Sequence, residues 1–290
     1  MSKKRLSIIL PTFNSMPYLK FAVESILCQT YSNFNLIIVN DGSTDYTLDY
    51  LNKLSDSRIM IINKNHTGII DSCNIGLKIA NTEFIARTDA DDYYFANKFE
   101  KQINYLDQNP EITILGTNGV YLSENNKFSK IKINLPIKHE EIIDEIFFRK
   151  RGIIQSSIVF RSNILNEPRW YTDNILPEDY NFYLEYGLTG RIANISENLV
   201  AIRLHKSYSY KNIEYLINNL SNLLKKYHIL YGKKFKSINL IKLDTLAIII
   251  NKKAIYFFIN NKYCLALIYF CIGLTLNPKR SLNFIKNRII

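Results

Sequence analysis

Short apolar runs alternate with amphipathic stretches along the first hundred residues, and this alternation constrains the fold more than any other feature. The runs at 6–10 and 34–39 are apolar almost throughout, which is typical of strands buried on both faces. The stretch between them carries Leu19, Val23 and Ile26 at helical spacing. The predicted order continues with a short helix ending near 54, a strand at 58–62, a helix at 69–80 and a strand at 84–88. Such units predict an α/β fold with a mostly parallel central sheet flanked by helices.

Three of the predicted strands are followed at once by a polar tract. The tracts are PTFN at 11–14, NDGSTD at 40–45 and TDADD at 88–92. Ligands of open α/β sheets bind beyond the carboxyl ends of the strands. The sequence therefore predicts that the three tracts meet at one edge of the sheet and form a single site.

The pattern is looser after residue 97. We expect helices at 97–109, 140–148 and 180–186 and strands near 112–115 and 157–160. From about residue 212 the chain is expected to be helical and strongly apolar, with runs at 243–250, 254–259 and 263–276 separated by lysine and asparagine. Because none of these runs reaches the ~18–20 apolar residues that cross a bilayer, no transmembrane helix is expected.

Charge is divided unevenly along the chain. The net charge of +11 comes from residues 211–290, which hold 14 Lys+Arg against 2 Asp+Glu, whereas residues 1–210 carry a net charge of −1. We therefore expect a catalytic domain at 1–210 and a basic, apolar helical region at 211–290. The near-neutral first part argues against a nucleic-acid partner.

The cysteines and the first residues of the chain bear on its compartment. Cys28, Cys73, Cys264 and Cys271 lack the paired spacing of metal sites, so buried, reduced thiols are expected. The apolar run before Pro11 is too short for a signal peptide. A cytoplasmic location is the resulting expectation.

Asp89, Asp91 and Asp92 form the sharpest local feature of the sequence. Three carboxylates within four positions repel one another unless a cation or backbone donors compensate. Oxygen ligands suit a hard divalent cation such as Mg²⁺ or Mn²⁺ that also binds substrate phosphates. The alternative is an acidic turn that caps a helix starting near Phe95.

Several motifs occur together in a characteristic order. They are PTFN at 11–14, QTYSNFNLIIVNDGSTD at 29–45, Asn74 with Gly76 in SCNIGLKIA, and FIARTDADD at 84–92 followed by NKFEKQINYLDQNPEI. Their combination resembles the family 2 glycosyltransferases, and above all the bacterial cell-surface polysaccharide branch. The resemblance covers about residues 5–210. It implies a GT-A fold, a nucleotide-sugar donor carried by UDP, and inversion at the anomeric carbon.

The resemblance also implies where the nucleoside of the donor binds. Pro11 and Thr12 would lie against the base and the ribose, with Asn14 close by. Asp41 would accept a hydrogen bond from the pyrimidine ring. Asn74 would join this site through its own motif.

The phosphates and the metal would be held by a second group of residues. By resemblance, Asp91 would bind a Mn²⁺ or Mg²⁺ ion that bridges the diphosphate, and Asp89 would contact the ribose or the metal. Arg87 would stand near the phosphates, or else form an ion pair with one of these carboxylates. His205, in a segment resembling Arg-x-His-x-x-Ser, would complete the metal shell or touch the diphosphate; its alternative role is structural or solvated.

Transfer to an acceptor hydroxyl requires a general base, because the pKa of a hydroxyl lies far above 7. Glu178-Asp179 matches the Glu-Asp pair of the family. Asp179 would be the base, and Glu178 would orient it or the acceptor. The alternative is a carboxylate pair at the start of the helix at 180–186, where it would complement the helix dipole.

The sequence departs from the family pattern at three places. The Asn-x-Gly that many relatives carry after the third strand is shifted by one position in Asn65-His66-Thr67-Gly68. Cys73 stands where an arginine is common before the equivalent of Asn74. Arg169-Trp170 lacks the upstream glutamine of the processive synthases, so addition of one sugar per encounter is expected.

Two interpretations remain open for the basic region at 211–290. It could form a helical hairpin that packs on the catalytic domain, with lysines that keep it soluble. It could instead contact the inner face of the plasma membrane, since apolar faces flanked by lysine suit an anionic bilayer surface. Glycan acceptors linked to lipid would make the second arrangement useful.

Other functions are weighed against glycosyl transfer. A sugar nucleotidyltransferase would need a glycine-rich, basic phosphate loop after the first strand, where this chain has PTFNSMPY. A non-catalytic nucleotide-sugar-binding protein would be expected to have lost carboxylates that are present here. A dehydrogenase is favoured still less, because no Gly-x-Gly-x-x-Gly follows a predicted strand.

Overall fold

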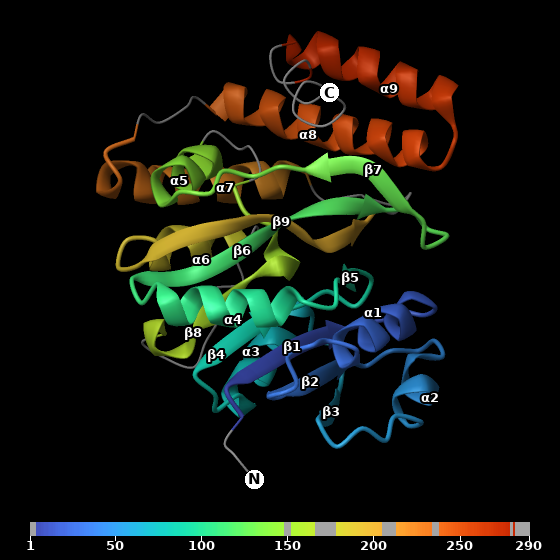
Figure 1. Ribbon diagram of the computed structural model, residues 1–290. Coiled ribbons are helices and arrows are strands. Elements are labelled where there is room, and N and C mark those ends of the chain that lie inside the picture. The colour runs from blue at the N-terminus through green and yellow to red at the C-terminus, as the bar shows by residue number, and fades with distance from the viewer. Residues whose placement is uncertain are drawn as a thin grey trace.

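The computed structural model describes residues 4–147, 152–165, 178–204, 213–233, 238–278 and 281. In these ranges the strands form one nine-stranded sheet with helices on both faces (Figure 1). The strand order is β3-β2-β1-β4-β8-β6-β9-β5, and β7 pairs with β6 outside this path. The predicted α/β class is confirmed.

The first half of the sheet is parallel and follows the predicted order of elements. Its strands are β1 (Leu6–Thr12), β2 (Phe34–Asp41), β3 (Ile59–Lys64) and β4 (Phe84–Arg87), connected by α1 (Tyr18–Leu27), α2 (Thr47–Leu51) and α3 (Ile69–Ile79). All seven residues of β1 are buried. The reason is that β1 has neighbours on both sides, with Ile9 in register with Ile37 of β2 and with Arg87 of β4.

The second half of the sheet is mixed. Its strands are β5 (Tyr93–Tyr94), β6 (Ile112–Leu122), β7 (Phe128–Ile133), β8 (Val159–Arg161) and β9 (Arg191–Arg203). β8 is antiparallel to both β4 and β6, whereas β9 is parallel to β6 and carries the short edge strand β5. The change from parallel to antiparallel pairing therefore falls next to β4, the strand that leads into the aspartate tract.

Alternation along β1 divides the apolar core into two layers. Leu6, Ile8 and Leu10 face one core, which α1 and α4 (Lys98–Gln108) cover. Ile9 faces the other core, which is built with α3, α5 (His139–Phe147) and α6 (Glu178–Tyr186). Each fully buried side chain of this size stabilises the fold by about 1.5–3 kcal/mol. The strands are thus fixed between helices, and the loops at their ends are held in place.

Three helices follow the sheet: α7 (Ile213–Leu230), α8 (Ile238–Ile259) and α9 (Tyr263–Leu276). Leu220 and Leu224 of α7 belong to the core around Ile9, and Tyr256 of α8 belongs to the core around Ile8. α9 lies against the outer side of α8 (Figure 1), where the rings of Phe257 and Tyr269 stack with centroids 5.2 Å apart. α7 and α8 therefore contribute side chains to the cores of the sheet, whereas α9 packs on α8.

The apolar runs expected at 243–250 and 254–259 belong to one helix, because α8 runs through Lys252 and Lys253 without interruption. Lysine is a good helix former, so a polar pair ends an apolar run without ending the helix. No described helix is long and apolar enough to cross a membrane.

The expected burial of the cysteines is confirmed for Cys73 and is wrong for Cys28, Cys264 and Cys271, which are exposed. An apolar run does not bury each of its members, because one face of a surface helix remains in contact with solvent.

Candidate functional site

The aspartate tract lies where β4 ends. Thr88, the residue after β4, is held to β1 because its N–H and its hydroxyl both donate to the Ile9 carbonyl at 3.0 Å. The next turn brings Asp89, Asp91 and Asp92 together, with one carboxylate oxygen of each within 4.8 Å of the others. Three hard oxygen ligands so close together can bind one divalent cation.

Asp92 is the buried member of this cluster. Its Oδ2 accepts a hydrogen bond from Ser156 Oγ at 2.5 Å, and its Oδ1 accepts one from the Arg203 backbone N–H at 2.9 Å. Burial, together with the charges of Asp91 and Asp89, raises the pKa of Asp92 well above its ordinary value, although both hydrogen bonds oppose this shift. Asp92 therefore anchors the turn from inside, whereas Asp89 and Asp91 are only half-buried.

Asp89 is fixed through both its side chain and its backbone. Its carboxylate forms an ion pair with Arg87, which is the alternative that the sequence left open for this arginine. The buried Tyr94 hydroxyl accepts from the Asp89 N–H at 2.6 Å and donates to the Asp89 carbonyl at 2.9 Å. Burial raises the pKa of Asp89, the positive charge of Arg87 lowers it, and repulsion from Asp91 raises it, with a net increase. A bound cation would relieve this repulsion.

Arg203 is an organising residue whose role the sequence did not indicate. It is 2% exposed, and its Nε donates to the Asp91 carbonyl at 2.8 Å. Its Nη1 donates to the Ser123 carbonyl at 2.6 Å and its Nη2 to Asn126 Oδ1 at 2.7 Å. The guanidinium also lies over the Tyr18 ring, 4.2 Å from the centroid. One side chain thus connects the aspartate turn, the β6–β7 hairpin and α1.

The signal for Arg203 was present in the sequence, at the start of the segment RLHKS at 203–207. That segment drew attention to His205, which lies outside the described residues. The proposed metal or phosphate role of His205 therefore stays a prediction.

Asp41, at the end of β2, is surrounded by donors from its own chain. Its Oδ1 accepts from the Thr67 N–H at 2.9 Å and pairs with the Lys64 ammonium, and its Oδ2 accepts from the Gly68 N–H at 2.9 Å. Burial alone would raise the pKa of Asp41, but these hydrogen bonds lower it below its ordinary value. The loop after β3 thus holds this carboxylate ionised and in one orientation.

Asn14 joins the first two polar tracts. Its side-chain oxygen accepts from the backbone N–H groups of Thr44 at 2.8 Å and Asp45 at 3.3 Å, and its own N–H donates to Ser43 Oγ at 3.0 Å. Its φ of +48° is a left-handed conformation that asparagine tolerates better than most residues. The predicted convergence of these two tracts is confirmed, and Asn14 fixes their loops.

The other residues expected at the nucleoside lie on neighbouring elements. Pro11 and Thr12 are buried at the end of β1, and the Thr12 hydroxyl has no hydrogen-bond partner among the described residues. Asn74 is half-buried on α3, the helix that also carries Gly76. A Cβ on Gly76 would meet Ile9 Cγ2 at 2.6 Å, so this glycine lets α3 approach β1 closely.

The two carboxylates expected to supply the general base, Glu178 and Asp179, lie at the start of α6. Asp179 is half-buried, and its Oδ1 accepts from the Tyr180 N–H at 2.9 Å, in keeping with a carboxylate at a helix start. Phe182 and Tyr183 anchor the helix in the core around Ile9. The side chain of Glu178 lies outside what the structure describes. The catalytic roles of both carboxylates stay predictions.

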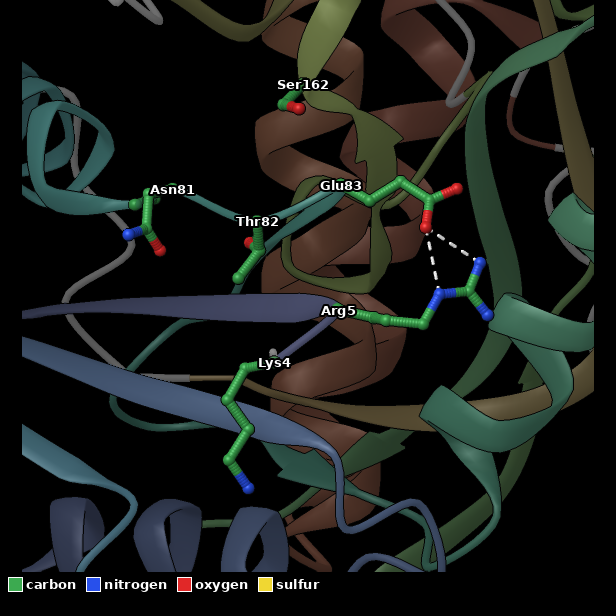
Figure 2. Close-up of a pocket in the computed structure, with 7 residues that line it drawn as sticks. Lys4, Arg5, Asn81, Thr82, Glu83 and Ser162 are labelled. Carbon is green, nitrogen blue, oxygen red and sulfur yellow. Dashed lines mark hydrogen bonds and ion pairs between the residues drawn. The ribbon is translucent and has the colours of Figure 1, made fainter. Parts of the chain in front are cut away.

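A polar hollow of about 500 Å³ lies at the opposite ends of the strands (Figure 2). It is lined by residues that precede β1 and β4, including Lys4, Arg5 and Glu83. Figure 2 shows Glu83 paired with Arg5, whose guanidinium also binds Asp107 at 2.7 and 2.9 Å. Because this arginine is already paired with two carboxylates and the aspartate cluster is at the other edge, we regard the hollow as structural.

A comparison with protein-family models matches residues 7–167 to the model described as glycosyl transferase family 2. The matched segment covers β1 to β8 and so includes Asp41 and the aspartate cluster. The chain belongs to glycosyl transferase family 2. The enzyme is a glycosyltransferase, and the predicted family is confirmed.

Curated relatives extend the likeness beyond the matched segment. An uncharacterized glycosyltransferase of Haemophilus influenzae is 33% identical over 256 residues, covering 82% of this chain and 79% of the relative. The Escherichia coli protein named UDP-Glc:alpha-D-GlcNAc-diphosphoundecaprenol beta-1,3-glucosyltransferase WfaP is 31% identical over 226 residues, covering 76% of this chain and 85% of WfaP.

A solved structure supports the fold of this glycosyltransferase. Staphylococcus aureus TarS 1–349, crystallised in complex with UDP-GlcNAc, superposes with a TM-score of 0.60 at 15% identity, covering 90% of this chain and 89% of TarS 1–349. The GT-A fold expected from the sequence is confirmed, with the C-terminal helices added to it.

Proposed function

We propose that this glycosyltransferase moves one sugar from a UDP-sugar to an acceptor hydroxyl, with inversion at the anomeric carbon and with a divalent metal ion. The observation that carries the proposal is the aspartate cluster at the end of β4, on the sheet edge where Asp41 also lies. Two similar proteins support UDP as the carrier: WfaP is named for UDP-Glc, and TarS was crystallised with UDP-GlcNAc.

Asp91 and Asp89 are the residues that would hold Mn²⁺ or Mg²⁺, with His205 as a further candidate. The cluster fits such an ion, because its ligand atoms lie within 4.8 Å of one another and two of its carboxylates are only half-buried. The ion would neutralise charge that develops on the departing diphosphate. Arg87 supports this site by holding the Asp89 carboxylate in place.

The nucleoside would bind between the first two polar tracts, against Pro11 and Thr12 and near Asn74. Asp41 suits a pyrimidine N–H, because its carboxylate is kept ionised and oriented by Thr67 and Gly68. The loop fixed by Asn14 would shape the same pocket.

Asp179 would accept the proton of the attacking hydroxyl, and Glu178 would orient it or the acceptor. A base on the first turn of a helix that is anchored in the core is held in a fixed position. A single displacement assisted by one base inverts the configuration at the anomeric carbon. These roles place the catalytic machinery within residues 1–210, as the domain division proposes.

The acceptor would be a glycan of cell-surface polysaccharide synthesis that is linked to lipid, because WfaP is named for a diphosphoundecaprenol-linked acceptor. Addition of one sugar per encounter is proposed, because the sequence lacks the glutamine of the processive signature.

We also propose that the enzyme contacts an anionic membrane surface through α9, from a cytoplasmic location. Only Ala266 and Gly273 are fully buried on this helix, and no charged residue occurs between Tyr263 and Leu276. Its exposed large apolar side chains are Tyr263, Leu265, Leu267, Ile268 and Ile272.

Charge favours a membrane over a second copy of the chain as the occupant of this face. Residues 211–290 carry a net charge of +12, so two copies meeting here would repel each other, whereas anionic headgroups would attract the same charge. The 14 residues of α9 suit a helix that lies in the interface without crossing it.

The test of glycosyl transfer is hydrolysis of a panel of nucleotide sugars without acceptor, in Mn²⁺, in Mg²⁺ and in EDTA. We expect slow, metal-dependent release of UDP from one donor, and loss of release in Asp91→Ala. Asp49→Ala, which removes an exposed carboxylate on α2, is the matched control and should retain release. Failure of the enzyme to bind or hydrolyse any donor would contradict the proposal.

A further inference from the structure

His66 places a flat ring with an N–H group at the position expected for the base of the donor. Its Nδ1 lies 2.8 Å from Asp41 Oδ2 and 3.2 Å from the Asp41 carbonyl oxygen. Its ring stacks on the Phe13 ring with centroids 4.1 Å apart and an interplanar angle of 23°. Phe13 follows β1 directly, so the stack bridges the first polar tract and the loop after β3.

The partners of Nδ1 determine which ring nitrogen carries the proton. The Asp41 carbonyl accepts hydrogen bonds only, and the Asp41 carboxylate is ionised because its pKa is lowered. A nitrogen that lies between two acceptors must be the donor. His66 therefore donates from Nδ1 to Asp41 while its ring face rests on an aromatic side chain.

A pyrimidine would make the same two interactions at this place. Its ring N–H would donate to Asp41, and its ring face would stack on an aromatic side chain. We propose that His66 occupies the nucleobase position in the ligand-free enzyme and leaves it when the donor binds. This inference rests on the proposed function. The His66 side chain would compete with the nucleobase and so lower the apparent affinity for the donor.

The neighbouring contacts indicate that only the side chain of His66 would move. A Cβ built on Gly42 would meet the His66 backbone nitrogen at 2.8 Å, so the two backbone segments are in close contact. The Thr67 and Gly68 N–H groups are bound to Asp41 and hold the loop after β3 in place. The His66 side chain, in contrast, is 56% exposed and has room to rotate towards solvent.

Removal of the imidazole should therefore strengthen UDP binding. If the closed rotamer is the major state, the apparent Kd is raised by the inverse of the open fraction. We expect His66→Ala to lower the Kd for UDP about threefold or more in calorimetric titrations with Mg²⁺. His228→Ala, which removes a histidine on α7, is the matched control and should leave the Kd unchanged.

Imidazole NMR gives a second readout that does not depend on affinity. The chain has four histidines, so the His66 signals can be assigned by their loss in His66→Ala. Addition of UDP to the wild-type enzyme should shift the His66 signals away from their carboxylate-bonded position, and the His228 signals should stay in place.

The outcomes separate this inference from the donor proposal. UDP binding to the wild type with an equal or weaker affinity in His66→Ala, or with unshifted His66 signals, would overturn the displacement and leave the donor proposal standing. Absence of UDP binding in every variant would contradict the UDP donor and this inference with it.

Discussion

Asp92 and Arg203 lie 111 positions apart in the chain, yet the Arg203 N–H donates to Asp92 Oδ1 at 2.9 Å. The Arg203 side chain returns to the same turn and donates to the Asp91 carbonyl. The aspartate cluster is therefore held from the far end of β9 as well as from β4. Its geometry depends on a buried arginine that need not touch the substrate.

Replacement of Arg203 should cost both stability and activity. We expect Arg203→Met to lower the free energy of unfolding by about 3 kcal/mol or more, because it leaves buried carbonyl groups unpaired. Donor hydrolysis should fall with it even where the variant is folded, and urea unfolding with hydrolysis assays measures both.

The matched control for this change is Arg191→Met at the other end of β9. Arg191 is half-exposed and pairs with the exposed Glu140 at 2.9 Å, so its loss should cost less than about 1 kcal/mol. Equal destabilisation by the two changes would contradict the role given to Arg203.

Asp91→Asn should remove the stabilisation of the fold by metal. Without metal the substitution relieves repulsion from Asp89 and Asp92 but also loses the attraction to Arg203, so we expect an unfolding temperature close to that of the wild type. With saturating Mn²⁺ the wild type should be the more stable, because it alone keeps the ligand. Calorimetry in EDTA and in Mn²⁺ measures this difference, and an equal rise of the unfolding temperature in both proteins on addition of Mn²⁺ would mean that Asp91 does not bind the ion.

The lowered pKa of Asp56 predicts that the free energy of unfolding depends on pH in the acidic range. Hydrogen bonds from the side chain and backbone of Arg58 lower the pKa of Asp56 from 3.8 to about 2. The stabilisation is therefore complete above the unfolded pKa and is lost as the pH falls from about 4 to about 2.

We expect Asp56→Asn to be less stable than the wild type by about 1–2 kcal/mol at pH 7 and by progressively less below pH 4. Urea unfolding at pH 7, 4, 3 and 2.5 measures this convergence. A difference that stays constant over this range would show that the carboxylate charge contributes nothing.

A charge on α9 should prevent the proposed membrane contact. Leu267 is 63% exposed, so Leu267→Glu should leave the fold intact while it weakens binding to phosphatidylglycerol vesicles by about fivefold or more. Met60→Glu is the matched control, because Met60 is 49% exposed on β3, at the opposite end of the molecule (Figure 1).

Co-sedimentation with vesicles of phosphatidylglycerol and of phosphatidylcholine, together with sedimentation equilibrium, completes this experiment. Equal binding by the two variants would contradict the membrane contact. A wild-type dimer that Leu267→Glu converts to a monomer would instead assign the face to a second copy of the chain.

The parallel half of the sheet could be predicted because β1, β2 and β4 are buried almost throughout and read as continuous apolar runs. The edge strand β3 is only partly buried, but it still carries four apolar residues in a row at 59–62. β9 could not, because Ser196, Glu197 and Asn198 interrupt it where its register with β6 shifts. β5 has only two residues and takes its strand conformation from pairing with β9. Local sequence carries little information on elements that are formed by tertiary contact.

The candidate site, too, could be predicted from the sequence only in part. Asp41 and the aspartate tract could be placed at one edge because carboxyl ends of parallel strands share an edge. The donors around Asp41, and the position of His66 on Phe13, could not be predicted, since they depend on how the loop after β3 turns back. Arg203 was missed because its motif drew attention to His205, and because an arginine at a strand end gives no sign of burial.

The antiparallel pairing of β8 with β4 has a consequence for the order in which the enzyme assembles during synthesis. It brings Ser156, which precedes β8, to Asp92, which follows β4, across 64 positions of the chain. The loops around Asp41 need only the first four strands, which are made early. The carboxylate turn gains its last two anchors only when β8 and β9 have emerged from the ribosome. The loops around Asp41 can thus form on a nascent chain before the carboxylate turn, and we expect no donor hydrolysis until nearly all of the sheet has folded.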